Sequence, residues 1–75
     1  MTPELTVTIE AMRQFGGGFT THLANAIAAA DPGNRRVLLD AFPDLIQKYG
    51  PATPFGQATS AMQELAHHFS ESLAA

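Results

Sequence analysis

The sequence predicts an all-α fold, a small bundle of four to five short helices in a single domain that spans residues 1–75. The stop and start signals of the sequence and the spacing of its apolar residues support this prediction. Proline and capping residues mark helix starts, glycine or proline marks the stops, and apolar residues recur at helical spacing between them. The chain has no cysteine, so neither disulfides nor a thiolate zinc site can reinforce its small core. Oligomerisation is the remaining common route to stability for so short a chain.

The first helix is predicted to begin in the Thr-Pro-Glu sequence of residues 2–4 and to end near Gln14. A hydroxyl cap, a proline at the first helical position and an acid in the first turn are typical start signals. Leu5, Ile9 and Met12 then follow at helical spacing. Residues 5–9 also alternate apolar and β-branched polar side chains, as a strand does, so an N-terminal strand is the alternative.

Three consecutive glycines separate Phe15 from Phe19. A dinucleotide-binding fingerprint would need a further glycine where the chain has Thr21, and a phosphate-binding loop would need a lysine next to the glycines. We therefore expect a joint between helices, in which glycine takes positive φ and both phenylalanines enter the same core. An anion bound to the amides at the start of the next helix, with Thr20 and Thr21 as extra donors, is the lesser alternative.

Further breaks divide the middle of the chain. Asp31 and Pro32 form a cap-and-proline start, Pro43 breaks or restarts the helix that follows, and Gly50 with Pro51 forms a stop. Apolar residues at helical spacing between these breaks are predicted to face the core. Before Asp31 they are Phe19, Leu23, Ala26, Ile27 and Ala30. Between Pro32 and Pro43 they are Leu38, Leu39 and Phe42, and from Phe42 to Gly50 they are Phe42, Leu45, Ile46 and Tyr49.

The last helix is predicted to begin at Thr53 and Pro54 and to run for about twenty residues. Its apolar positions have the alternating spacing of a coiled-coil seam: Phe55, Ala58, Met62, Leu65 and Phe69. The spacing fits both burial in the chain's own core and pairing with another chain. Because a short chain without disulfides gains most from oligomerisation, we expect a homodimer through this helix. No Lys or Arg occurs in residues 51–75, so the charge pairs of a long free coiled coil are missing.

The polar residues form no recognisable catalytic, metal or cofactor site. His67 and His68 point about 100° apart on a helix, so they cannot chelate one ion together. Glu64 with His68, or His67 with Glu71, has workable spacing, but two ligands do not close a zinc site. The serines lack the glycine pattern of a nucleophile elbow. We expect no enzymatic activity, no metal and no cofactor.

The net charge of −3 opposes nonspecific attraction to a nucleic-acid backbone. No helix shows the basic and amide face of a DNA-recognition helix. No apolar run approaches the ~20 residues that span a bilayer, and the first residues do not resemble a secretory signal. We therefore expect a cytoplasmic protein without nucleic-acid or membrane partners. The candidates for a partner-binding polar surface are Arg35, Arg36, Asp40, Asp44 and Lys48.

Residues 16–51, GGGFTTHLANAIAAADPGNRRVLLDAFPDLIQKYGP, resemble small proteins of unknown function encoded by bacteriophages and prophages of Proteobacteria. Those proteins combine a glycine-rich turn, an Ala-rich helix, an Asp-x-x-Asn-Arg turn and a Phe-Pro-acid segment that ends in Tyr-Gly. The resemblance implies an accessory phage gene, of a kind that often encodes inhibitors of host proteins. We expect a protein-binding module that inhibits a host protein, for example a CRISPR effector. The alternatives are a small DNA-associated transcriptional regulator and a virion structural or assembly protein.

Overall fold

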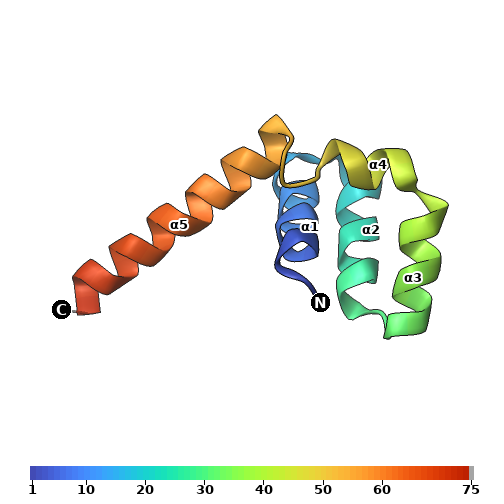
Figure 1. Cartoon of the computed structure of the whole chain (residues 1–75), viewed down its shortest axis with the longest axis horizontal. Coiled ribbons are helices and arrows are strands. Elements are labelled where there is room, and N and C mark those ends of the chain that lie inside the picture. Colours follow the sequence, from blue (N-terminus) through green and yellow to red (C-terminus); the bar gives the residue numbers. More distant parts are fainter. Residues whose placement is uncertain (75) are drawn as a thin grey trace.

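The computed structural model describes the backbone of residues 1–74 and the side chains of residues 1–70. The described residues form five helices and no strand, which confirms the all-α prediction. The helices are α1 (Pro3–Phe15), α2 (Gly18–Ala29), α3 (Pro32–Ala41), α4 (Pro43–Lys48) and α5 (Pro54–Ala74). As Figure 1 shows, α1, α2 and α3 stand side by side, α4 crosses their upper end, and α5 extends away from the bundle.

Helix α1 begins as its sequence predicts. The Leu5 amide donates to Thr2 Oγ1 over 3.1 Å, and Pro3 occupies the first turn. The helix accommodates the β-branched threonines that suggested a strand, because the hydroxyls of Thr6 and Thr8 find acceptors in the carbonyls four residues earlier. The strand alternative for residues 5–9 is therefore wrong.

The joint between α1 and α2 depends on close approach rather than on unusual backbone angles. We predicted that a glycine in this joint takes positive φ. No glycine in the described chain does, so this prediction is wrong. Gly16 is extended, at φ −82° and ψ 159°. A Cβ added there would lie 2.6 Å from Thr20 Cβ and would also meet the Met12 carbonyl oxygen, whereas a Cβ on Gly17 would meet nothing. One glycine lets the two helices meet tightly.

The two phenylalanines beside the glycines do not share one core, contrary to the prediction. The ring centroid of Phe15 lies 5.2 Å from that of Phe55, while Phe19 makes an edge contact with Phe42 at 5.6 Å. Both remain partly in solvent, with 40% of Phe15 and 63% of Phe19 exposed. The buried face of α2 is rotated from the predicted one: it consists of Thr20, Leu23, Ala24 and Ile27, and Ala26 is exposed.

The core lies mainly between α1 and α2. The buried apolar side chains are Ile9, Ala11, Met12, Leu23, Ala24, Ile27 and Tyr49. Helices α3 and α4 cover this core with half-buried residues, Leu38, Leu39, Phe42, Leu45 and Ile46. These are positions that the apolar spacing predicted. Pro43 restarts the chain as a new helix, also as predicted.

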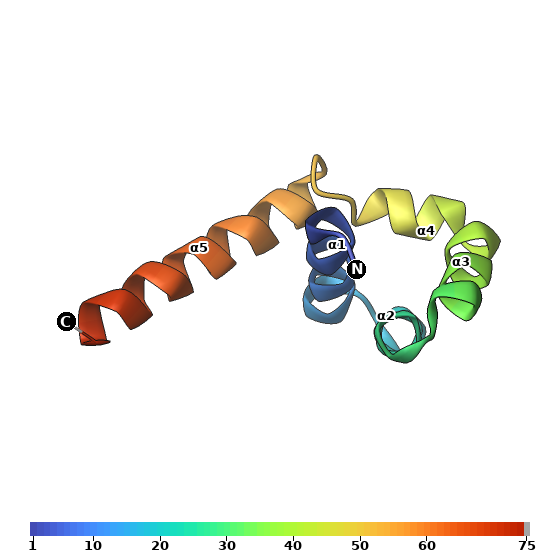
Figure 2. The same cartoon turned by 60° about the horizontal axis from the view of Figure 1, so that its bottom comes forward.

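Helix α5 gives the molecule its long dimension, and the Cα trace extends 44 × 25 × 21 Å. Thr53 caps the helix, because its hydroxyl accepts from the Gly56 amide over 3.2 Å. Helix α5 packs only its first turns against α1 and the turn after α4, and then diverges from α1 (Figures 1 and 2). The second half of α5 therefore projects from the bundle.

Candidate protein-binding surfaces

The apolar face of α5 is divided between two environments. In the first half, Phe55 packs against the rings of Phe15 and Tyr49, with centroids 5.2 and 5.1 Å apart. Phe55 was predicted to lie in an intermolecular seam, but its contacts are within the chain. Ala58 is exposed. Met62 lies at the boundary, where its sulfur accepts a weak hydrogen bond from Gln14 Nε2 at 3.9 Å.

From this boundary onward, four residues form what we call the apolar tip of α5: Met62, Leu65, Ala66 and Phe69. They lie at i, i+3, i+4 and i+7, so they share one face of the helix. The exposed fractions are 41% for Met62, 70% for Leu65 and 64% for Phe69. Together the four residues line a shallow apolar recess of about 420 Å³. Three of them, Met62, Leu65 and Phe69, belong to the predicted seam.

The flanks of the apolar tip carry no charged residue of the Lys, Arg, Asp or Glu type. At about 100° per residue, Ala61 and His68 border one side of the tip, and Gln63 and Ser70 border the other. Glu64 lies on the opposite, polar face of the helix. A negatively charged partner that binds the apolar tip therefore meets no acidic side chain on its flanks.

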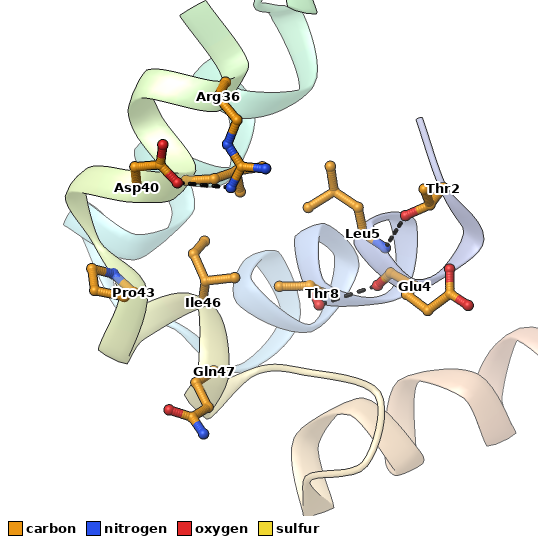
Figure 3. Close-up of a pocket in the computed structure, with 10 residues that line it drawn as sticks. Thr2, Glu4, Leu5, Thr8, Arg36, Asp40, Pro43, Ile46 and Gln47 are labelled. Carbon is orange, nitrogen blue, oxygen red and sulfur yellow. Dashed lines mark hydrogen bonds and ion pairs between the residues drawn. The ribbon is translucent and has the colours of Figure 1, made fainter.

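A second surface is a groove of about 600 Å³ between α1, α3 and α4 (Figure 3). We call it the α1–α3–α4 groove. The residues that line it are Thr2, Glu4, Leu5, Thr8, Arg36, Leu39, Asp40, Pro43, Ile46 and Gln47. In Figure 3 the side chains of Leu5 and Ile46 point into the space between α1 and the other two helices. The groove combines an apolar lining with charged groups at its edges.

The charged groups on the α3 side of this groove pair with each other. Arg36 donates to Asp40 Oδ1 over 2.8 Å, and both side chains are about two-thirds exposed. The hydroxyls of Thr2 and Thr8 are engaged in hydrogen bonds with the backbone of α1. Within residues 1–70, no ion pair engages Glu4. The groove therefore offers apolar contact, one exposed ion pair and one free carboxylate.

The remaining charged candidates have separate positions. Arg35 donates to the carbonyls of Ile27 and Ala30, so its cation stabilises the C-terminal end of α2. Lys48 lies 5.6 Å from the ring centroid of Tyr49, and Asp44 is exposed in the first turn of α4. Of the five predicted residues, only Arg36 and Asp40 come together in the groove.

The other predicted features can be placed as follows. Asp31 stands at the N-cap of α3, yet its carboxylate accepts from the Asn34 side chain over 2.6 Å instead of capping the backbone. Among the described side chains, no three His, Asp or Glu residues gather closely enough to hold a metal ion. The side chain of Glu71, a potential partner of His67, lies outside the described residues. No described helix combines the length and hydropathy needed to cross a bilayer.

The groove was not predicted from the sequence. Its walls come from three helices, and no local pattern in any one of them encodes how the others are placed. Leu39 and Ile46 were predicted as core residues, and their incomplete burial beside the groove is a property of the packed structure.

No protein-family model matches the chain, and no curated protein or solved structure matches it either. The resemblance of residues 16–51 to phage and prophage proteins stays a prediction. The apolar tip and the α1–α3–α4 groove are therefore the features of this chain that bear on its function.

Proposed function

We propose that this chain is a non-catalytic protein-binding module of a phage or prophage, which self-associates as a dimer and inhibits a host protein in the bacterial cytoplasm. An anti-defence role, such as inhibition of a CRISPR effector, is the form of this function that we favour. The observation that carries the proposal is the apolar tip of α5, because Met62, Leu65 and Phe69 share one exposed face. A contiguous exposed apolar patch on a small protein is typical of a protein interface.

The energy available at the apolar tip favours association. A large apolar side chain contributes about 1.5–3 kcal/mol when it passes from full exposure to full burial. Leu65 and Phe69 are each more than 60% exposed, so pairing can recover most of that energy from both copies. The same burial within the chain is prevented because α5 diverges from α1 (Figure 1).

The proposed host-binding surface is the α1–α3–α4 groove with the neighbouring charges Asp44 and Lys48. An open groove with an apolar lining and an exposed ion pair suits contact with a protein surface. A small domain has little room for both a core and a deep substrate pocket, which supports a non-catalytic role. Three of the four basic side chains are engaged within the chain: Arg13 with Glu10 and Asn25, Arg35 with α2 carbonyls, and Arg36 with Asp40. This distribution disfavours the transcriptional-regulator alternative.

Light scattering tests the dimer. We expect the wild type at high micromolar concentration to show twice the monomer mass of 8.0 kDa. Leu65→Glu places an uncompensated charge in the apolar tip and should give a monomer that retains its helicity by circular dichroism. Gln57→Glu, which places the same charge on the exposed polar side of α5 away from the apolar tip, is the matched control and should remain dimeric. A monomeric wild type at this concentration would contradict the dimer.

Host-protein binding is tested by affinity capture from bacterial lysate with wild type and Arg36→Glu. We expect a specific protein to be captured by the wild type and lost with the variant, which removes the exposed ion pair without touching the core. A duplex-DNA mobility shift is the parallel measurement. Tight, strongly salt-dependent DNA binding at physiological salt would support the regulator instead, because phosphate contacts release counterions.

A further inference from the structure

We infer that the dimer forms by antiparallel pairing of the two α5 helices, centred between Leu65 and Ala66, with Phe69 of each copy lying near the last turn of the other copy's α1. This inference rests on the proposed function, since it specifies the partner and the geometry of the apolar tip. It adds the direction of pairing, the register and a second contact on α1.

The two ends of α5 differ in what surrounds them. The N-terminal turns are enclosed by the chain's own bundle: Phe55 contacts Phe15 and Tyr49, and Gly56 and Thr59 are buried. In the C-terminal half, each side chain of residues 61–70 is exposed, and Met62 meets α1 through a weak hydrogen bond from Gln14. Figures 1 and 2 show that α5 diverges from α1 and extends away from the bundle.

A parallel pair conflicts with this arrangement. In parallel helices each residue faces its own equivalent, so the partner helix would continue beside Phe55 and Thr59. That face is occupied by the chain's own α1 and the turn before α5. Both bundles would also have to occupy the same end of the pair. The parallel direction therefore needs the helices to separate sharply at Met62.

The antiparallel direction avoids the conflict. Each bundle lies at its own end of the pair, and the part of the partner helix that approaches α1 is the part around Phe69, which projects from the partner's own bundle. The part of α1 nearest to that approach is its last turn, where Gln14 touches Met62 and 40% of Phe15 is exposed. Antiparallel helix dipoles are also favourably aligned.

The apolar tip is complementary to itself in this direction. With the two-fold axis between Leu65 and Ala66, Met62 faces Phe69 of the second copy, and Leu65 faces Ala66. A large side chain thus meets a small one at the centre, which lets the helices approach closely. The flanks of the tip carry no acidic side chain, which explains how a chain with a net charge of −3 can pair with its own copy: they consist of Ala61, Gln63, His68 and Ser70.

Because the apolar tip is small, we expect the dimer to be weak. A standard stable interface buries about 1,600 Å² in total, and a strip of four residues, Met62 to Phe69, spans only about 10 Å of helix. The contact of Phe69 with the last turn of the other copy's α1 would enlarge the interface. We expect a reversible dimer that dissociates on dilution to the low micromolar range.

Cysteine cross-linking reports the direction of pairing, and the absence of natural cysteine makes the reading unambiguous. Met62→Cys and Phe69→Cys are prepared separately, one with a mass tag, and are oxidised alone and as a mixture at high micromolar concentration. Circular dichroism checks that each variant is folded, as expected for exposed positions. Gln57→Cys, on the exposed polar side of α5, is the control that should not cross-link.

The antiparallel register predicts a strong mixed disulfide between the Met62→Cys and Phe69→Cys variants, and little disulfide in either variant alone. Disulfides within each variant and none enriched in the mixture would show parallel pairing and overturn the inference while preserving the dimer. No disulfide in any sample, with a dimeric wild type by light scattering, would place the interface elsewhere and also overturn it. A monomeric wild type would remove both the inference and the proposed dimer.

Discussion

The two halves of α5 have the same apolar periodicity and opposite environments. In residues 54–60, Gly56 and Thr59 are buried and Phe55 is half-buried against two other rings. In residues 61–70, Leu65 and Phe69 occupy the same face of the helix and lie mostly in solvent. The periodicity determines which face of a helix is apolar. Whether that face is covered depends on the length and direction of the helix beside it, here α1.

The boundary between the halves has a physical cause. The first turns of α5 come very close to the turn that precedes them, since a Cβ on Gly56 would lie 2.7 Å from the Gly50 carbonyl carbon and from Pro51 Cα. This contact fixes the direction in which α5 leaves the bundle. Because α5 then diverges from α1, Leu65 and Phe69 are left mostly in solvent (Figure 1).

Replacing one phenylalanine with alanine in each half of α5 is the most direct test of the difference in burial between the halves. We expect Phe55→Ala to lower the free energy of unfolding by about 2–3 kcal/mol, because a half-buried ring with two aromatic contacts is lost. Phe69→Ala should change it by less than about 0.5 kcal/mol at concentrations where the protein is monomeric. Urea denaturation at low concentration measures both. Similar losses in the two variants would mean that the second half also packs on the bundle.

Gly56→Ala tests the close approach that directs α5. In an open helix, replacing glycine with alanine stabilises by about 0.5–1 kcal/mol. Here the added methyl overlaps the backbone of Gly50 and Pro51, so we expect a loss of about 1–3 kcal/mol. Gly33→Ala is the matched control, because its nearest neighbour, Asp31 Oδ2, would lie at 3.7 Å. A stabilised Gly56→Ala variant in thermal denaturation would refute the close approach.

The α1 helix on which α5 packs is itself held at the Gly16 joint. We expect Gly16→Ala to destabilise by more than about 1 kcal/mol, because the methyl would overlap Thr20 and the Met12 carbonyl. Gly17→Ala should lie within about 0.5 kcal/mol of wild type, since its Cβ would meet open space. Phosphate and nucleotides should leave both melting temperatures unchanged. Nucleotide-dependent stabilisation would instead support anion binding at the start of α2.

The smallest expected effect concerns cooperativity in the free half of α5. Ala61→Gly lowers helix propensity at an exposed position by about 1 kcal/mol. If residues 61–70 are held only by helical hydrogen bonds, the variant should lose helicity there, with a change below about 0.5 kcal/mol in global unfolding. Circular dichroism and urea denaturation at low concentration measure the two quantities. A global loss equal to the full propensity cost would show that the free half unfolds together with the bundle.

Much of the fold could be predicted because its signals are local. The starts at Thr2, Pro32, Pro43 and Thr53 each depend on a cap or on the fixed φ of proline. Within the candidate surfaces, the exposed face containing Met62, Leu65 and Phe69 was predicted as a seam, because helical spacing alone places them together. The pairing of Arg36 with Asp40 follows from the same spacing of four residues.

Only the tertiary structure decided which of these residues meet one another. Phe55 belongs to the chain's own packing and Leu65 does not, although both lie in one periodic pattern. Thr20 occupies the buried position predicted for Phe19, because the close approach at Gly16 sets the rotation of α2. The α1–α3–α4 groove likewise depends on how three helices are placed. The sequence determined where helices begin and which face of each is apolar, since caps and periodicity act within a few residues. Which apolar faces are buried was decided by contacts between segments far apart in the chain, which no local pattern specifies.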